Sequence, residues 1–401
     1  MIDLRAARAD PEAFRAAVAR KNAAAAEAFE ELLAADEQWR ELVPQVDELR
    51  SRTKVKGKPT PEQLEELRGV KEELQRTEQE LAQAESARDE IGLRIPNPPA
   101  DDVPDGATED DVREVRRVGE PPPLDEPRES LELGRFDMER AARMSGARFG
   151  YWIGDTGRLA LALYRYGLDR LAAKGFVTVL PPVLVREEAL YGTGHFPSDE
   201  DSVYAVPADG LYLSGTAEIP VSSLHAGEIL DADLLPIRYV AFSPCFRREA
   251  GAAGRDTRGM FRVHQFNKVE QFSLTVPEAS RDEHELLLAN TEELVQGLGV
   301  PYRVVVLPAG DMSAASAKTY DIEIWFPSQD RYRETASISN TTDFQARRLG
   351  IRYRDGKSPE PLHMLNGTAA VDRMALAVLE NLQGEVPEVL REYGAPERIT
   401  P

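Results

Sequence analysis

The sequence reads Phe246-Arg-Arg-Glu249, then a connection that contains three glycines, then Phe261-Arg-Val-His-Gln-Phe-Asn-Lys-Val-Glu270. Aromatic and β-branched residues on both sides of a glycine-rich stretch predict two strands joined by a long loop. Side chains alternate between the two faces of a strand, so each predicted strand gathers a set on one face: Arg247 and Glu249 on the first, and Arg262, Phe266 and Glu270 on the second. These segments therefore predict one sheet face that carries arginines, carboxylates and an aromatic ring.

This predicted face has the chemistry of a nucleotide site. Arginine guanidinium groups bind phosphate oxygens through paired hydrogen bonds, an aromatic ring stacks on a base, and a carboxylate binds an amine or a hydroxyl. Alternating charges are also typical of the solvent-exposed side of an edge hairpin. The residues of this hairpin alone leave both interpretations open.

A third segment, Asn366-Gly-Thr-Ala-Ala-Val-Asp-Arg373, leads into the apolar helical run from Met374 to Leu382. This pattern predicts that Arg373 lies in the first turn of a helix, where a cation opposes the helix dipole by about 0.3 to 1 kcal/mol. An anionic ligand at the same place removes the conflict, as phosphates do at helix N-termini. An ordinary surface arginine is the alternative.

The rest of the C-terminal part alternates between strand-like and helix-like segments. Runs of β-branched and aromatic residues predict strands at 176–180, 237–242 and 302–307, and helical patterns occupy 159–173 and 283–298. This is a mixed α+β domain, expected over residues 113–401. A stretch rich in proline and aspartate predicts a linker at 96–112.

The first 95 residues have helix composition and a heptad-like pattern. Apolar and small residues recur at steps of three and four in two series: Leu32, Ala35, Trp39, Leu42, Val46 and Leu49, then Leu67, Val70, Leu74, Thr77, Leu81, Ala84, Arg88 and Ile91. Two helices of about thirty residues, each roughly 45 Å long, are expected to pair as an antiparallel coiled-coil hairpin. Pro44 is expected to kink the first of them.

The turn of this hairpin carries a cluster of basic residues without an acid: Arg50, Arg52, Lys54, Lys56 and Lys58. A solvated charged turn is one interpretation of such a cluster. Its position at the far end of a long arm, on a protein that is otherwise acidic, favours contact with an anionic polymer instead.

Composition excludes several classes of protein. The 401 residues are 42 % apolar, enough for two or three domains with cores, and 70 acidic against 49 basic residues give a formal charge of -21. A generally basic nucleic-acid-binding surface is therefore excluded. The single cysteine, Cys245, is expected in the core, and five scattered histidines argue against a zinc site. No apolar stretch approaches a membrane span or a signal core, so we expect a soluble, cytoplasmic protein without membrane contact.

The chain resembles the bacterial-type seryl-tRNA synthetases, a family of class II aminoacyl-tRNA synthetases, over nearly its whole length. Gly175-Phe-Val-Thr-Val-Leu-Pro-Pro182 is similar to class motif 1, Phe246 to Glu270 to motif 2 and Asn366 to Arg373 to motif 3. Three stretches are typical of the serine branch: Gly215-Thr-Ala-Glu218, the run from Phe242 to Gly254, and the run from Arg333 to Arg348.

The resemblance implies a role for each matching residue. It implies catalytic roles for Arg247, Glu249, Arg262 and Arg373. It implies that serine is bound by Thr216, Glu218, Arg247, Glu270, Asn366 and Thr368. It implies that ATP, a substrate, is bound by Arg247, Glu249, Arg262, His264, Phe266, Glu334, Ser337 and Arg373. Within that set, Phe266 would stack on adenine, Arg247 would hold the α-phosphate and Arg373 the γ-phosphate. Glu334 and Ser337 would hold Mg²⁺, since a hard cation prefers oxygen ligands.

The implied reaction has two steps, formation of seryl-adenylate and transfer of serine to the 3' end of serine tRNA, with selenocysteine tRNA as a further possible acceptor. The arm would bind the long variable arm of the tRNA, residues 250–260 would meet the acceptor end, and motif 1 around Pro182 would form a homodimer. Two alternatives remain: a paralogue that makes seryl-adenylate for antibiotic resistance or biosynthesis, and a non-catalytic interaction protein derived from a synthetase.

Overall fold

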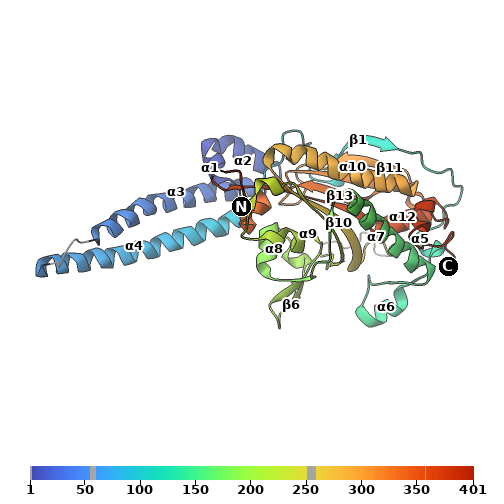
Figure 1. Cartoon of the computed structure of the whole chain (residues 1–401), viewed down its shortest axis with the longest axis horizontal. Helices are drawn as coiled ribbons and strands as arrows, with labels where there is room; N and C mark the ends of the chain where they lie inside the picture. The colour runs from blue at the N-terminus through green and yellow to red at the C-terminus, as the bar shows by residue number, and fades with distance from the viewer. Residues whose placement is uncertain (1, 55–59, 251–258, 357) are drawn as a thin grey trace. The chain divides into compact units, whose positions relative to one another are not determined.

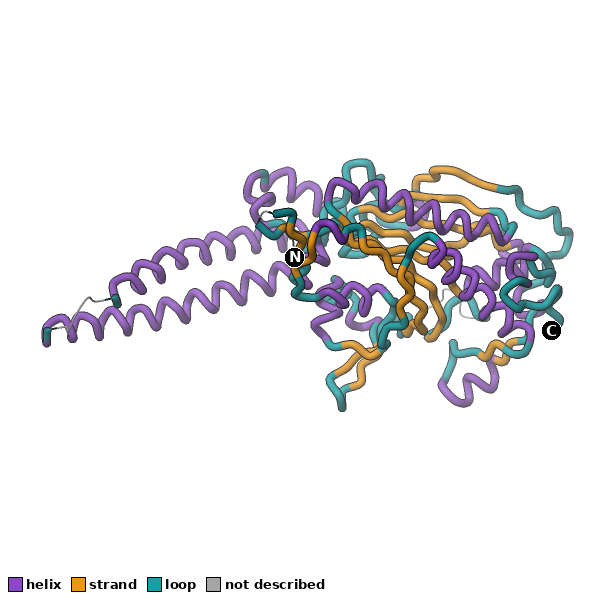
Figure 2. The backbone as a smooth tube through the Cα atoms, in the orientation of Figure 1, coloured by secondary structure: helices purple, strands orange, loops and turns teal. Residues whose placement is uncertain are grey.

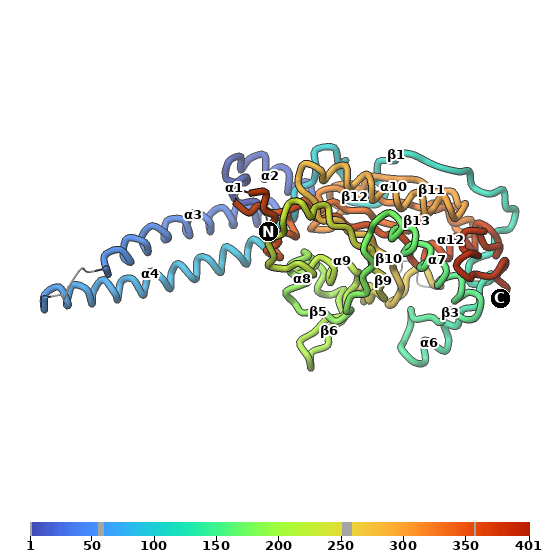
Figure 3. Tube along the Cα trace, in the orientation of Figure 1, coloured from blue at the N-terminus to red at the C-terminus, as the bar shows by residue number. Residues whose placement is uncertain are grey.

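The computed structural model describes residues 2–54, 60–250, 259–356 and 358–401, which divide into two compact units, Met1–Pro98 and Pro99–Pro401. Figure 1 labels the elements, and Figure 3 follows the chain from one terminus to the other. In the part of the chain that is described, no helix is both long enough and apolar enough to cross a membrane.

The smaller unit is a helical hairpin. It consists of α1 (Leu4–Ala9), α2 (Pro11–Ala19), α3 (Ala23–Arg52) and α4 (Pro61–Leu93). Helices α3 and α4 run antiparallel beside one another (Figure 2) and bury the expected seam: Leu32, Val46 and Leu49 on α3 against Val70, Thr77 and Ala84 on α4. The predicted pair of long helices is confirmed, and Pro44 lies inside α3 without interrupting it.

Both long helices begin at residues that cap their free amide groups. The Asn22 side chain accepts a hydrogen bond from Ala25 N at the start of α3, and Thr60 and Gln63 form a reciprocal capping box at the start of α4. At the distal end, the Arg50 side chain pairs with Glu78 of α4, with 2.9 Å between Nη2 and Oε1. Capping and pairing thus hold the ends of a hairpin whose stability comes from the buried seam.

The larger unit is built on an eight-stranded sheet, counted over the described residues, with the strand order β1-β11-β12-β13-β16-β10-β9-β4. Neighbouring strands are antiparallel except β4, which runs parallel to β9. The strands are β1 (Arg113–Val118), β4 (Val177–Val179), β9 (Ile237–Phe246), β10 (Gln265–Thr275), β11 (Tyr302–Val306), β12 (Lys318–Phe326), β13 (Arg331–Asn340) and β16 (His363–Val371).

Two long helices, α7 (Asp155–Ala173) and α10 (Ser280–Leu298), pack on one face of this sheet (Figure 1). Alternation along β10 sorts the two faces: Val269 is in the main apolar core and Gln271 bonds to α10, whereas Lys268 and Glu270 point to the other face. The apolar core therefore lies under the helices. The opposite face is free to carry polar groups.

The remaining elements surround the sheet. They are α5 (Ser130–Leu133), β2 (Phe136–Asp137), α6 (Met138–Ser145), β3 (Tyr151–Trp152), β5 (Leu184–Val185), α8 (Glu187–Thr193), β6 (Tyr204–Val206), β7 (Leu211–Leu213), α9 (Glu218–Ser222), β8 (Ile229–Asp231), α11 (Phe344–Leu349), β14 (Arg352–Arg354), β15 (Glu360–Pro361), α12 (Asp372–Asn381) and α13 (Glu388–Arg391). The predicted α+β class is confirmed.

The strand boundaries around the glycine-rich connection differ from the prediction. Strand β9 ends at Phe246 and β10 begins at Gln265, so Arg247, Glu249 and Arg262 lie outside regular strand. Glu249 has a φ of 52°, which no strand residue adopts. Period-two alternation is therefore wrong for these three positions, although it holds for Phe266 and Glu270.

The predicted linker 96–112 crosses the boundary between the two units at Pro98. Beyond that point the chain already packs on the larger unit: Ala100 N donates to Ala317 O at 2.8 Å, and Val103 is 4 % exposed within the main core. Residues 107–110 and Val112 line the cavity described below. The division into arm, linker and catalytic domain stays a prediction about function.

Candidate active site

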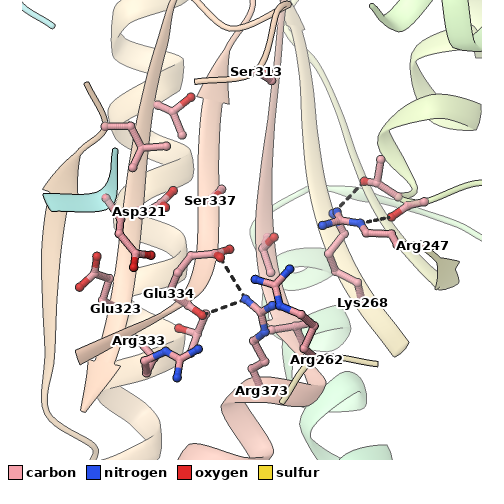
Figure 4. Close-up of a pocket in the computed structure, with 18 of the residues that line it drawn as sticks. Arg247, Arg262, Lys268, Ser313, Asp321, Glu323, Arg333, Glu334, Ser337 and Arg373 are labelled. Atoms are coloured by element: carbon pink, nitrogen blue, oxygen red, sulfur yellow. Dashed lines mark hydrogen bonds and ion pairs between the residues drawn. The ribbon is translucent and has the colours of Figure 1, made fainter. Parts of the chain in front are cut away.

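A cavity of about 1160 Å³ lies on the polar face of the sheet. Its lining comes from β10, β12, β13 and β16, from the start of α12, and from the chain before β1 and around Gly215. Two groups of charged side chains face it, one around Glu270 and one around Glu334. Figure 4 shows Arg262 and Arg373 side by side, with Glu334 facing Arg373 and with Asp321 and Glu323 on the neighbouring strand.

The Glu270 cluster, defined as Thr216, Glu218, Lys268 and Glu270, occupies one part of the cavity. Lys268 Nζ donates to Glu270 Oε1 and to Thr216 Oγ1, each at 2.7 Å. Thr216 Oγ1 donates to Glu270 Oε2 at 2.6 Å, and Glu218 N donates to the same oxygen at 3.0 Å. The Lys268 and Glu270 side chains are 8 % and 4 % exposed. This is a closed set of charge-assisted hydrogen bonds, which are strong because water is excluded.

Glu218 is held in this cluster from behind. Gln345 of α11 donates from Nε2 to Glu218 Oε1 at 2.7 Å and to Thr193 O at 3.0 Å. Burial, together with the neighbouring charge of Glu270, raises the pKa of Glu218 to about 7. His195 also lines the cavity, and burial lowers its pKa to about 4, so the imidazole is neutral at physiological pH.

Strand register brings Asn366 and Thr368 to the same part of the cavity. Thr368 lies directly opposite Glu270, and Asn366 lies opposite Phe272. The register shifts by one residue between Val269 and Glu270, a β-bulge in the β10–β16 ladder. Directly opposed residues share a face, so Thr368 and Glu270 point into the cavity together.

The Glu334 cluster, defined as Glu249, Arg262, Glu334 and Arg373, is ionic and more open. Arg373 Nη1 donates to Glu334 Oε2 at 3.0 Å, and Arg262 Nη1 donates to Glu249 Oε2 at 2.6 Å. Arg373 lies in the first turn of α12, as predicted, and its guanidinium lies 4.6 Å from the centre of the Phe261 ring. Partial loss of water in the cavity would by itself raise the pKa of the half-exposed Glu334, but the charges of Arg373, Arg247 and Arg262 hold that pKa below its usual value.

A bulge on β13 places Glu334 and Ser337 on one face. Residues three apart face opposite sides of a regular strand, but the β12–β13 register shifts at this point, so that Glu323 opposes Glu334 while Asp321 opposes Ser337. Arg303 offsets the opposed carboxylates by donating to Glu323 at 2.7 Å. Burial, reinforced by the charge of Glu334, raises the pKa of Asp321 well above its usual range.

Arg247 and Phe266 line the same cavity as these two clusters. The Arg247 guanidinium lies 5.2 Å from the centre of the Phe266 ring, and its Nε donates to Gly215 O at 3.2 Å. A cation stacked near an aromatic ring leaves its remaining N–H groups available to an anion.

The structure gathers almost all of the predicted site residues into the cavity. Thr216, Glu218, Arg247, Glu249, Arg262, Phe266, Glu270, Glu334, Ser337, Asn366, Thr368 and Arg373 all line it. His264 is the exception: its Nδ1 lies 2.9 Å from Arg247 O, and its ring packs near Phe149 and Tyr204 instead of on the cavity. His264, which the resemblance assigns to the ATP site, precedes β10, which begins at Gln265.

Sequence reasoning did not assign several residues of the site, among them Lys268, His195, Asp321 and Gln345. Lys268 had a usable signal, because it shares the strand parity of Phe266 and Glu270. His195, Asp321 and Gln345 come from other segments, and only the folded chain brings them close.

The structure describes only some of the basic residues predicted at the tip of the arm. Arg50 pairs with Glu78, and Arg52 and Lys54 are exposed, whereas Lys56 and Lys58 lie outside the described residues. Most of the predicted acceptor-end loop, 251–258, also lies outside them. Cys245 is fully buried, as expected for a core residue.

Comparison with known families identifies the chain. The family model described as "tRNA synthetase class II core domain (G, H, P, S and T)" matches residues 204–382, and the model described as "Seryl-tRNA synthetase N-terminal domain" matches residues 1–99. The fold is therefore that of a class II aminoacyl-tRNA synthetase, which is a ligase.

Relatives over the full length narrow this class. A Serine--tRNA ligase of Thermobifida fusca is 44 % identical over 100 % of this chain and 99 % of its own, and Serine--tRNA ligase 1 of Streptomyces avermitilis is 42 % identical over 100 % and 99 %. A seryl-tRNA synthetase of Pyrococcus horikoshii, solved in complex with ATP, is 38 % identical with a TM-score of 0.95 over 100 % of both chains. The chain belongs to the seryl-tRNA synthetase family, which confirms the resemblance.

Proposed function

We propose that this protein is a serine–tRNA ligase, which activates L-serine with ATP as seryl-adenylate and transfers serine to the 3' end of serine tRNA. The observation that carries the proposal is the joint presence, in one cavity, of the buried Glu270 cluster and of the arginines Arg247, Arg262 and Arg373. The first has groups for an amino acid, and the second for a nucleotide triphosphate.

The Glu270 cluster supports serine as the amino acid. Carboxylates at Glu218 and Glu270 suit the α-ammonium group, while Thr216, Asn366 and Thr368 offer polar atoms for the side-chain hydroxyl. A buried polar pocket rejects alanine because the missing hydroxyl leaves protein groups unpaired, a penalty that reaches about 10⁴ in rate. Arg247 would bind the serine carboxylate and the α-phosphate together and so bring the attacking oxygen close to phosphorus.

The Glu334 cluster supports ATP. Arg262 and Arg373 supply fixed positive charge for the phosphates, and Phe266 supplies a ring for adenine. Glu249 Oε2 accepts a hydrogen bond from Arg262 Nη1 at 2.6 Å, so Glu249 acts by holding that arginine in place. The side chain of His264 contacts the main-chain oxygen of Arg247. Any contribution of His264 to the nucleotide site would therefore pass through Arg247.

Magnesium fits the donors on β12 and β13. Among the described residues, no group of three His, Cys, Asp or Glu side chains is arranged to hold a metal by itself. Mg²⁺ usually takes one or two carboxylates and completes its shell with substrate phosphates, which Glu334 and Ser337 would allow. Asp321 Oδ1 is buried without a hydrogen-bond partner beside them. When bound, the ion would neutralise charge on the phosphates.

We further propose that the helical arm binds the tRNA and that two chains form a homodimer around motif 1. On the larger unit, β4 is an edge strand, and Val177, Leu180 and Leu184 near Pro182 are 58 %, 75 % and 44 % exposed. An exposed apolar edge of this kind favours burial against a second copy. A cytoplasmic location follows from the tRNA substrate.

Amino-acid-dependent exchange of pyrophosphate into ATP, measured with all twenty amino acids, tests the activation step. Of the twenty, serine alone should support strong exchange. Strong exchange with a different amino acid, or no exchange with any amino acid, would refute the proposal. Charging of a serine tRNA transcript then separates a tRNA ligase from a paralogue that delivers seryl-adenylate elsewhere.

A further inference from the structure

Lys268 occupies the centre of the group proposed to receive serine. Its ammonium donates to Glu270 Oε1 and Thr216 Oγ1, the same atoms that a substrate ammonium would approach. Only 8 % of the side chain is exposed. Burial of an ion pair is costly, and apolar residues of similar volume often stabilise a protein equally well. The presence of a lysine at this position is therefore better explained by the charge that it brings to the pocket than by a contribution to the stability of the fold.

The charges around this position form a simple balance. Glu218 and Glu270 contribute two negative charges when both are ionised, and Lys268 cancels one of them. The remaining single negative charge matches one substrate ammonium. Lys268 also lowers the pKa of Glu218, which burial and Glu270 raise, and so helps Glu218 to be ionised near neutral pH.

We propose that Lys268 is a positioning and specificity-determining residue, which orients the Glu270 carboxylate and limits the pocket to amino acids that carry one ammonium group and a neutral side chain. This inference rests on the proposed activation of serine. Lys268 acts through Glu270 and Thr216. The contacts of Lys268 with Glu270 and Thr216 are already formed in the protein without a bound substrate.

This role predicts which analogue the pocket rejects. L-2,3-diaminopropionate has the shape of serine but carries an amino group in place of the hydroxyl. Its two neighbouring amines repel each other when both are protonated, so the doubly cationic form is present only near and below neutral pH. In the native pocket a second cation would meet Lys268 with only one uncancelled negative charge to share. Without Lys268, two carboxylates would face two ammonium groups, and discrimination against the analogue should weaken.

The experiment compares pyrophosphate exchange with serine and with L-2,3-diaminopropionate at about pH 6.5, where much of the analogue carries both protons, in the full-length protein. In Lys268→Met and Lys268→Gln, the ratio of kcat/KM for the analogue to kcat/KM for serine should rise by about tenfold or more, equivalent to about 1.4 kcal/mol. Lys268→Arg retains the charge and should keep the ratio within about threefold of the wild-type value, even if both rates fall, since about 0.65 kcal/mol is a small change for a retained charge.

Lys174→Met is the matched control, because Lys174 also pairs with a glutamate, Glu293, at 2.5 Å but lies outside the cavity lining. Its ratio should equal that of the wild type. An unchanged ratio in both neutral variants, with normal wild-type exchange, would overturn this inference and leave the proposed function intact. Loss of a cooperative thermal transition in both neutral variants would assign Lys268 to folding and overturn it as well. A wild-type protein that ignores serine would instead overturn the proposed function.

Discussion

The two ends of the cavity handle charge in opposite ways. In the Glu270 cluster, both carboxylate oxygens of Glu270 accept hydrogen bonds from the protein, and the side chain is 4 % exposed. In the Glu334 cluster, Arg373 and Glu334 are 22 % and 50 % exposed. The amino-acid end is organised before any substrate arrives, whereas the nucleotide end offers charges that phosphates and a metal would complete.

This difference has a physical reason. Selection of a small amino acid depends on pairing each buried polar group, so that an analogue with the wrong group leaves a donor or an acceptor unpaired. A triphosphate is large and highly charged, and its binding needs cations held in place but accessible. A closed cluster suits the first task and an open one suits the second.

Replacement of Glu270 by alanine should have the largest effect and should remove the closed cluster altogether. Serine-dependent exchange should fall by about 10³-fold, equivalent to about 4 kcal/mol, because the serine ammonium would lose its carboxylate partner and meet the unpaired ammonium of Lys268. Glu293→Gln breaks the pair with Lys174 outside the cavity and should leave exchange unchanged. Near-normal exchange in the alanine variant would contradict the role of Glu270.

Replacement of Arg373 by alanine should disable the open cluster. Exchange should fall by about 10²-fold, as for the loss of one preorganised group at a developing charge, and the KM for ATP should rise while the KM for serine changes little. Steady-state kinetics with each substrate varied in turn measure this separation. An equal rise in both KM values would mean that the two ends of the cavity do not act independently.

The acidity of the closed cluster provides a pH test. The pKa of Glu218 is about 7, raised by burial and by Glu270 and lowered by Gln345, Lys268 and Arg247. Its ionised form would bind the serine ammonium, so the KM for serine should rise as the pH falls below about 7, by up to tenfold per unit. The nearby His195 has a pKa of about 4 and does not titrate in this range. Glu218→Gln should flatten this acid limb, and a limb that persists in that variant would assign it to another group.

Neutralisation of the arm's basic tip should spare both clusters. Changing Lys54, Lys56 and Lys58 to glutamine should leave serine-dependent exchange unchanged and should weaken tRNA charging by about tenfold at moderate salt, with a smaller salt dependence, because fewer phosphate contacts remain. Charging assays at two salt concentrations measure this effect. Charging that equals the wild type at both concentrations would identify the tip as a solvated turn.

The helical arm and the cavity differ in how much of each could be predicted from the sequence. The seam of the arm is formed by residues three and four apart, which lie on the same face of each helix. The heptad-like pattern therefore correctly predicted α3 and α4. Around the cavity, strand parity correctly grouped Phe266 and Glu270 but does not apply to Arg262, which precedes the start of β10. The β13 bulge that aligns Glu334 with Ser337 has no signal in residue spacing.

The sequence by itself determined the helical arm, the α+β class, the family and, Lys268 apart, the members of the two charged clusters, because local periodicity and short motifs are properties of neighbouring residues. Only the tertiary structure decided which groups touch. Lys268 donates to Thr216, Gln345 supports Glu218, and Arg373 meets Glu334, since each contact joins segments whose distance is set by strand order and register. The charge balance of the pocket, and with it the proposed selectivity, comes from those contacts.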